Sequence, residues 1–229
     1  MLSGLLPPWA GCAEARGEES VVLFPEEADV VARARAGRRR EFGTARLCAR
    51  RALGALGLPA SPLPRGPRGA PVWPEGVVGS ITHCDGYRAA AVARDRDAVA
   101  LGVDAEPDAP LSARALEAVA SGEERRRLVE HRRCRPDVSW DRLLFSAKES
   151  VYKVWSPLVG RWLGFEDAEV RFDPPGEGSR GTFHATIPAA PTGIPLPRRL
   201  RGHWLSRDGL LVTAIAVCPP PPDRMERTP

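Results

Sequence analysis

The chain of 229 residues is long enough to bury a core, because 43% of its side chains are hydrophobic and only 27% are charged. Its 33 basic and 29 acidic residues leave a net charge of +4, so we expect a mixed surface. No apolar run reaches the ~18 residues of a membrane span, which excludes a membrane partner at this stage. Five widely spaced cysteines without a C-x-x-C pair favour reduced thiols and a cytoplasmic location.

The first half of the chain predicts helix followed by strands. Residues 26–56 carry acids in the first turn and apolar residues at roughly helical spacing, and Gly37 and Gly43 can divide this helix. Proline and glycine then indicate an irregular loop. Short apolar runs separated by turn residues predict an antiparallel meander of three strands, at 77–83, 87–93 and 98–103.

The second half repeats this order. Helices are expected at 112–131 and 139–155, and strands at 168–172, 182–187, 202–205 and 210–217. Helices followed by strands favour an α+β fold over the alternating elements of a parallel sheet. We therefore predict two halves, residues 1–107 and 108–218, with a disordered tail at 219–229.

The segment FSAKESVYKVW, residues 145–155, contains both lysines of the protein, Lys148 and Lys153, whereas the other 31 basic residues are arginines. Its apolar residues form one helical face, and Glu149 and Lys153 lie off that face, one turn apart. The simplest explanation is an ordinary surface pair worth about 0.2–0.5 kcal/mol. Three further features favour a role in chemistry.

Two carboxylates end the strand predicted at 98–103. Asp104 and Glu106 are two residues apart, so in an extended chain they point to the same side. They are either two exposed acids or ligands of a hard cation, because Mg²⁺ is commonly held by one or two carboxylates with water and substrate phosphate.

The strand predicted at 77–83 also ends in polar residues, namely Ser80, Thr82 and His83. A histidine there is either a satisfied core residue or, with its hydroxyl neighbours, a contact for phosphate or sugar. Arg65 and Arg68 lie in the loop before this strand. Arginine binds phosphate through two hydrogen bonds, whereas lysine acts as a point charge. Together these features describe a site for a polyphosphate substrate and a divalent cation.

A basic stripe in the first helix gives an alternative. Eight arginines between Arg33 and Arg51 are interrupted by one acid, Glu41, which would suit a nucleic-acid-binding protein. The stripe contains one aromatic residue, Phe42, and no recognised nucleic-acid motif. The signatures of P-loop NTPases, Rossmann dehydrogenases, serine hydrolases and zinc proteases are absent from the sequence.

Three ordered blocks, residues 73–84, 102–106 and 145–153, resemble the signature blocks of the Sfp/EntD-type 4'-phosphopantetheinyl transferases, and most closely the actinobacterial PptT-like members. The resemblance implies a monomer of two similar, pseudo-symmetric α+β halves with coenzyme A in the cleft between them. The implied reaction transfers the 4'-phosphopantetheine arm of coenzyme A to a serine of an acyl or peptidyl carrier protein and releases 3',5'-ADP. Neither a nucleic acid nor a particular carrier pathway (fatty-acid, polyketide, nonribosomal peptide or siderophore) is implied by these blocks. A non-catalytic coenzyme A or nucleotide sensor is a further alternative.

The resemblance also implies roles for single residues. The serine hydroxyl needs a general base, which would be Glu149 or Glu106, directly or through a metal-bound water. By the resemblance, Mg²⁺ or Mn²⁺ would be bound by Asp104, Glu106 and Glu149, and the charge that develops at phosphorus would be neutralised by Lys148 and Lys153. The coenzyme A phosphates would contact Ser80, Thr82 and His83, and the 3'-phosphate would be bound by Arg38, Arg46 and Arg65, with Arg39, Arg40 or Arg68 as substitutes. The pantetheine channel would be lined by Tyr152 and Trp162.

Overall fold

A computed structural model describes residues 1–174, 176 and 178–219. The tail predicted to be disordered lies outside the described residues from residue 220 onward. No helix in this part of the chain is both long enough and apolar enough to cross a membrane. The elements in chain order are η1 (Leu2–Gly4), β1 (Gly11–Arg16), α1 (Pro25–Val30), α2 (Ala36–Ala55), η2 (Pro67–Gly69), β2 (Val77–Cys84), β3 (Tyr87–Arg94), β4 (Ala100–Pro107), α3 (Ala113–Val119), α4 (Gly122–Cys134), α5 (Trp140–Val159), η3 (Phe165–Asp167), β5 (Glu169–Phe172), β6 (Arg180–Thr186), β7 (Arg199–Arg207) and β8 (Leu210–Val217).

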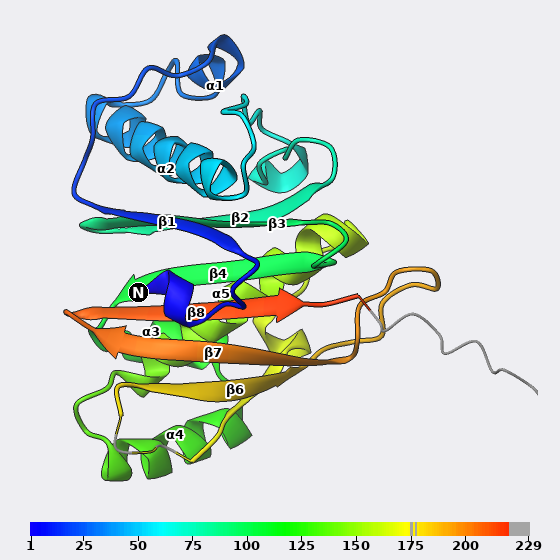
Figure 1. Cartoon of the computed structure of the whole chain (residues 1–229). Coiled ribbons are helices and arrows are strands. Elements are labelled where there is room, and N and C mark those ends of the chain that lie inside the picture. Colours follow the sequence, from blue (N-terminus) through cyan, green and yellow to red (C-terminus); the bar gives the residue numbers. More distant parts are fainter. Residues whose placement is uncertain (175, 177, 220–229) are drawn as a thin grey trace, which may run out of the picture.

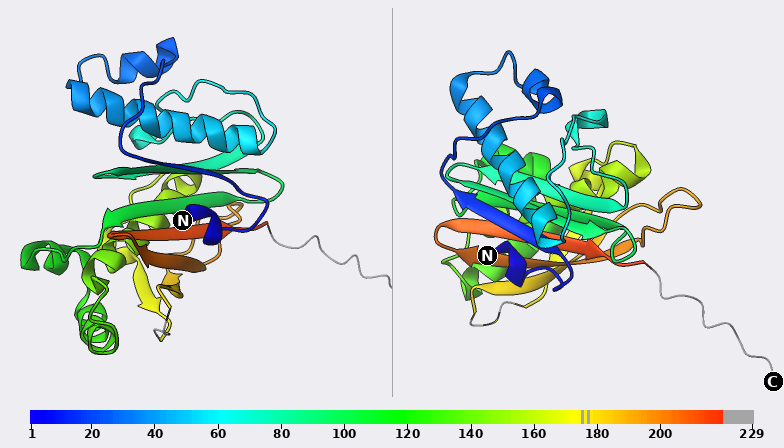
Figure 2. Two further views of the ribbon diagram at one scale, coloured as in Figure 1. Left: turned by 60° about the vertical axis from the view of Figure 1, so that its left-hand side comes forward. Right: turned by 45° about the horizontal axis from the view of Figure 1, so that its top comes forward.

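Two antiparallel sheets meet along β2 and β4 and are covered by helices (Figure 1), which confirms the predicted α+β class. The small sheet has the order β1-β3-β2 and the large sheet the order β4-β8-β7-β6-β5. Figures 1 and 2 show α2 across the outer face of the small sheet, with the large sheet on its other side. Helix α5 packs on the face of the large sheet that points away from the small one, so the layers run helix, sheet, sheet, helix.

Strand β3 is the central strand of the small sheet and is buried on both faces. Ala90 and Val92 point toward α2, whereas Ala89, Ala91 and Ala93 face the large sheet. Because these alanines are small, the two sheets can pack closely. Burial on both sides also explains why the strand reads as a continuous apolar run and not as an alternating pattern.

Strand β4 does not complete a meander with β2 and β3, contrary to the prediction. It pairs with β8, from Ala100 opposite Val217 to Pro107 opposite Leu210. Sheet membership therefore groups β4 with the strands of the second half, whereas the predicted boundary follows residue 107. The physical reason is that the long β8 strand offers β4 a full antiparallel ladder, which a short-range turn signal cannot reveal.

Helix boundaries also differ from the expectation. Residues 31–35 separate α1 from α2, and both Gly37 and Gly43 lie inside α2. The helix predicted at 112–131 is two helices, because Ser121 and Glu124 form a capping box that starts α4. Strand β1 was not predicted; its sequence GCAEAR lacks β-branched and aromatic residues, and pairing with β3 stabilises it.

Close contact between α5 and β4 depends on Gly102. A Cβ atom at this position would lie 2.1 Å from the backbone oxygen of Ser150 and 2.8 Å from Cγ2 of Val154. The helix that carries both lysines is therefore seated directly on the strand that carries Asp104 and Glu106.

We expect Gly102→Ala to lower the free energy of unfolding by at least about 2 kcal/mol, because helix backbone must move to admit the methyl group. The matched control is Gly54→Ala, inside α2, where nothing lies within 4 Å of the added Cβ. That change should raise stability by about 0.5–1 kcal/mol. Urea denaturation checks both, and equal effects of the two changes would contradict the close packing.

Candidate active site

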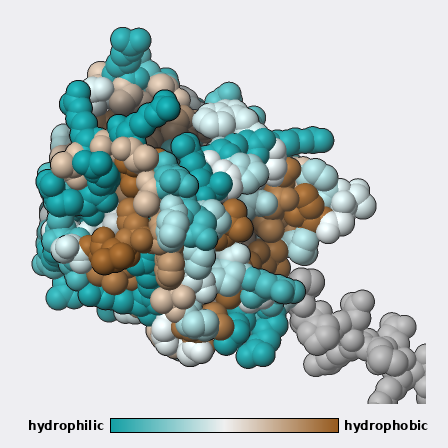
Figure 3. All heavy atoms as spheres, turned by 90° about the horizontal axis from the view of Figure 1, so that it is seen from above, coloured by the Kyte–Doolittle hydropathy of each residue, from teal (hydrophilic) through white to brown (hydrophobic). Residues whose placement is uncertain are grey.

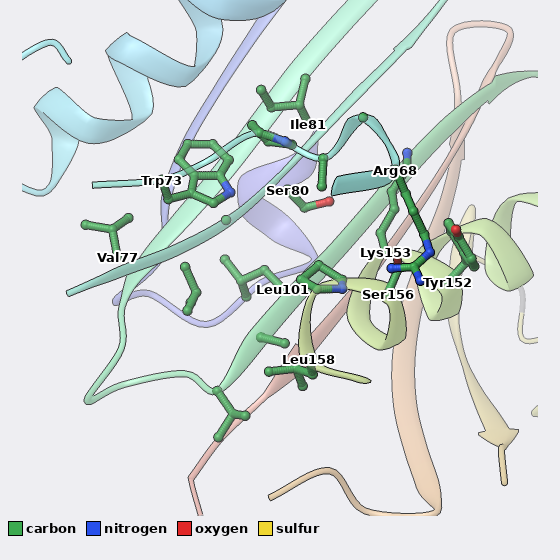
Figure 4. A pocket seen from close by; sticks show the side chains of 18 of the residues that line it. Arg68, Trp73, Val77, Ser80, Ile81, Leu101, Tyr152, Lys153, Ser156 and Leu158 are labelled. Atoms are coloured by element: carbon green, nitrogen blue, oxygen red, sulfur yellow. The ribbon is translucent and has the colours of Figure 1, made fainter. Parts of the chain in front are cut away.

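A cavity of about 480 Å³ lies where the two halves meet. One wall comes from the first half, with Arg68 and Trp73 in the loop before β2 and Ser80 in β2. The opposite wall comes from β4 and α5 and includes Leu101, Tyr152 and Lys153; Figure 4 shows these side chains around the space. The first and third sequence blocks therefore line a common cavity, which we call the main cavity, and the second block is connected to it through the contact of Asp104 with Lys153.

A second cavity of about 120 Å³ adjoins the first, and Glu149 and Tyr152 line both. Its other walls include Trp162 and Phe165. Trp162 is 73% exposed, and its ring lies 5.3 Å from that of Tyr152, so it covers the cavity from the solvent side. We call this space the small cavity.

Asp104 lies behind the wall of the main cavity, in contact with Lys153, and only 5% of its surface is exposed. Its Oδ1 accepts hydrogen bonds from Lys153 Nζ at 2.8 Å and from the Thr82 hydroxyl at 3.3 Å. The same lysine donates to the carbonyl oxygen of Val103 at 2.9 Å. Asp104 Oδ2 is buried and has no hydrogen-bond partner among the described residues, so one carboxylate oxygen is available to a ligand.

Glu106 and Glu149 complete a concentration of negative charge. Burial, and then the neighbouring charge of Asp104, raise the pKa of each above its usual range. Glu106 is held at 3.0 Å by Arg142, a residue that the sequence did not bring to notice. Glu149 makes no hydrogen bond or ion pair with any described residue. Its carboxylate is therefore the less restrained of the two.

The carboxylates suit a hard cation chemically. Burial and then mutual repulsion raise the pKa values of Glu106 and Glu149, and a divalent cation would relieve both effects and give the unpartnered Asp104 Oδ2 a partner. Within the described residues, however, no group of three or more histidine, cysteine, aspartate or glutamate side chains is already arranged to hold a metal. Binding would therefore need Glu106 or Glu149 to change rotamer, and the ligand set stays a prediction.

The hydroxyls of Ser80 and Thr82 join the two halves. Ser80 Oγ accepts from the backbone N–H of Val103 at 3.1 Å, and Thr82 Oγ1 accepts from that of Ala105 at 3.0 Å. The Thr82 proton is directed to Asp104. A phosphate contact from Thr82 would therefore compete with hydrogen bonds that Thr82 already makes. Ser80 lines the main cavity, and its hydroxyl group donates no hydrogen bond to a described residue.

His83 and Arg38 come together at the surface around Glu41. The His83 Nδ1 lies 2.9 Å from Glu41, the Arg38 guanidinium lies 3.3 Å from His83 Nε2, and Arg38 also pairs with Glu41. Burial lowers the pKa of His83, and Arg38 lowers it further against the opposing effect of Glu41. The two residues expected at a phosphate are neighbours, and a single carboxylate now balances their charge.

Arg46 occupies a different environment from Arg38. It is buried, stacks over the Phe42 ring and lies 3.9 Å from Glu27, a fully buried carboxylate that Arg50 also contacts. Burial lowers the pKa of Arg46 to about 10. In this arrangement the guanidinium joins α1 to α2 and does not reach the main cavity, so a 3'-phosphate contact from Arg46 would require rearrangement.

Of the two loop arginines, Arg68 and not Arg65 lines the main cavity. Arg65 packs its guanidinium against Gly69, whereas Arg68 reaches across to the carbonyl oxygen of Gly160 at the end of α5. The sequence analysis favoured Arg65 for the 3'-phosphate and kept Arg68 as a substitute; loop geometry decides which of them faces the cavity, and the phosphate contact itself stays a prediction.

Lys148 lines the small cavity next to Glu149 but not the main cavity, and its ammonium group is bound by the protein itself. It is 3% exposed, and its ammonium donates to Glu124 Oε2 at 2.8 Å and to the carbonyl oxygens of Val119 and Phe165 at 2.8 and 2.7 Å. All three protons are thereby used. A direct contact between Lys148 and a phosphate stays a prediction that this arrangement does not favour.

Five of the eight arginines in the basic stripe are paired with carboxylates. Arg46 and Arg50 turn inward to Glu27, while Arg40 pairs with Glu18 and Arg51 with Glu19. On the face that carries α1 and α2, hydrophobic side chains interrupt the hydrophilic ones (Figure 3). Arg33, Arg35 and Arg39 are exposed and make no ion pair with any described residue, so the nucleic-acid alternative is weakened rather than removed.

Comparison with known families agrees with this site. The family model of the 4'-phosphopantetheinyl transferase N-terminal domain matches residues 26–93, and that of the 4'-phosphopantetheinyl transferase superfamily matches residues 100–205. The division between the matches falls before β4, as the sheet pairing requires.

Three relatives extend the similarity to nearly the whole chain. The chain is 52% identical over 227 residues to 4'-phosphopantetheinyl transferase Svp of Streptomyces mobaraensis, covering 96% of this chain and 90% of that protein. It is 47% identical to 4'-phosphopantetheinyl transferase PptT of Mycobacterium tuberculosis, over 85% and 86% of the two chains. It is 31% identical to enterobactin synthase component D of Salmonella typhi, over 80% and 74%. With such identities along most of its length, the chain belongs to the 4'-phosphopantetheinyl transferases, an enzyme superfamily that includes these actinobacterial proteins.

Proposed function

We propose that the protein transfers the 4'-phosphopantetheine arm of coenzyme A to a serine of an apo acyl or peptidyl carrier protein, in a reaction that depends on Mg²⁺ and releases 3',5'-ADP. The observation that carries the proposal is the pairing of Lys153 with Asp104 at the wall of a cavity between the halves, next to an unpartnered carboxylate oxygen. Phosphoryl transfer is catalysed mainly by positioning of the reactants and neutralisation of charge, which a cationic side chain and metal-binding carboxylates can supply.

The serine oxygen would form the new bond to phosphorus as the bond to the bridging oxygen of the pyrophosphate breaks and 3',5'-ADP leaves. A divalent cation bound by Asp104, Glu106 and Glu149 would neutralise pyrophosphate charge. The Lys153 ammonium, 26% exposed, is the lysine that can approach the same charge. Arg38 and His83, which are neighbours at the surface, would receive the 3'-phosphate of coenzyme A.

Glu149 is the better candidate for the general base. Its raised pKa favours acceptance of a proton, and it lies between the two cavities without a competing partner, whereas Glu106 is held by Arg142. The small cavity, with Tyr152 and Trp162, has the apolar walls expected for a pantetheine chain. The carrier and its pathway are outside what these residues specify.

The direct test incubates the protein with coenzyme A, Mg²⁺ and several purified apo carriers and measures intact carrier mass. We expect a gain of one phosphopantetheinyl group, and Asp104→Asn should lower kcat by about a hundredfold because charge neutralisation at phosphorus is lost. Asp97→Asn, in a surface pair with Arg96, is the matched control and should act as wild type. If no carrier type gains mass with the wild-type protein, the proposed function is wrong.

Lys153→Arg tests the ammonium itself. The Lys153 ammonium contacts both Asp104 and the Val103 carbonyl oxygen from a single nitrogen atom, and a planar guanidinium cannot reproduce that geometry. We therefore expect kcat to fall at least tenfold. The melting temperature should change little, because positive charge opposite Asp104 is kept. Steady-state kinetics with coenzyme A and circular dichroism separate the two effects, and wild-type kcat would remove Lys153 from the catalytic site.

Trp162→Ala tests the small cavity. Because Trp162 is mostly exposed, its truncation should leave stability unchanged but raise KM for coenzyme A about tenfold through loss of the cavity wall. Val22→Ala, at a position that is 90% exposed and remote from both cavities, controls for surface truncation. An unchanged KM would show that the pantetheine chain binds elsewhere.

A further inference from the structure

The buried contact between Glu124 and Lys148 lies behind the small cavity and has no part in the chemistry described above. Glu124 is 1% exposed and Lys148 is 3% exposed. A buried pair of this kind gains little net stability over well-packed apolar residues, whereas removal of one partner is costly. Its presence beside Glu149 therefore calls for a reason other than stability.

The Glu124 carboxylate joins three segments. Its Oε2 accepts from Lys148 Nζ at 2.8 Å and from the backbone N–H of Ser121 at 2.8 Å, and its Oε1 accepts from the N–H of Val170 at 2.9 Å. The start of α4, the middle of α5 and the start of β5 are thereby held at one point.

Lys148 extends this connection to the wall of the small cavity. Its third contact is the carbonyl oxygen of Phe165, and Phe165 lines the cavity with Leu163 and Gly164, directly after Trp162. The contact fixes the 162–165 segment relative to the next residue of α5, Glu149. The distance across the small cavity is thus set by the buried pair.

We propose that Glu124 is a positioning residue for coenzyme A: through Lys148 it fixes the 162–165 segment against α5 and so sets the shape of the small cavity. This inference rests on the proposed function. It assigns Lys148 to the support of the cavity and not to the phosphate, since all three of its protons are taken. The coenzyme A phosphates are left to Lys153, Arg38 and His83.

A double-mutant cycle tests the proposal with Glu124→Gln, Lys148→Met and the two combined, each measured for equilibrium binding of coenzyme A and for KM and kcat of carrier modification. Each single change should weaken coenzyme A binding and raise KM about tenfold or more, with kcat of the saturated enzyme much less affected. The combined variant should be no worse than the worse single variant, because both changes remove the same connection.

Glu123→Gln is the matched control, since Glu123 is the neighbouring acid of α4, is half exposed and pairs with surface arginines. It should bind coenzyme A as wild type. All assays are run below the lowest melting temperature, so that only folded protein is compared.

Other outcomes overturn the inference. If the variants melt earlier but bind coenzyme A as wild type, the pair is only structural. If Lys148→Met lowers kcat far more than Glu124→Gln does, and the losses multiply in the combined variant, Lys148 contacts the substrate phosphate itself. Absence of carrier modification by the wild-type protein would instead refute the proposed function, so the two failures are distinguishable.

Discussion

The junction between β2 and β4 is the constraint on which the rest of the structure depends. These strands belong to different sheets and form no backbone ladder with each other in the described part of the chain. Ser80 and Thr82 in β2 instead accept hydrogen bonds from backbone N–H groups of β4. Lys153 in α5 donates to the carbonyl oxygen of Val103 in the same strand. Buried backbone groups that lack a ladder must find such partners, because an unpaired polar group is costly.

The same junction creates the site. Since side chains and not a ladder connect the sheets, a cavity can remain between the loop before β2 and helix α5. Thr82, which joins β2 to β4, is also a partner of Asp104, and Lys153 holds the same carboxylate from α5, so the position of the carboxylate is coupled to the way the halves meet. Gly102 brings α5 close enough for this to occur.

Charged residues in this protein divide by environment rather than by type. Lys148 and Arg46 are buried with carboxylates and serve the packing of helices, whereas Lys153, Arg38 and Arg68 lie where a ligand can reach them. Sequence motifs could not separate these groups, because a lysine at position 148 and one at position 153 differ by little more than one turn of the same helix. Which of them is enclosed depends on α4 and β5, whose contacts are remote in the chain.

Much of the molecule was predictable from local pattern. The α+β class, the helix with both lysines and seven of the eight strands follow from periodicity and turn residues, and two of the three motif blocks contribute residues to the main cavity. Strand β1, the pairing of β4 with β8, the inward turn of Arg46 and the buried pair of Lys148 with Glu124 were not predictable. The sequence by itself determined which chemical groups are present and which element carries each, because those properties are local. Only the tertiary structure decided which groups meet and which are buried, because strand pairing and helix packing bring together residues that are far apart in the sequence, such as Ala100 and Val217.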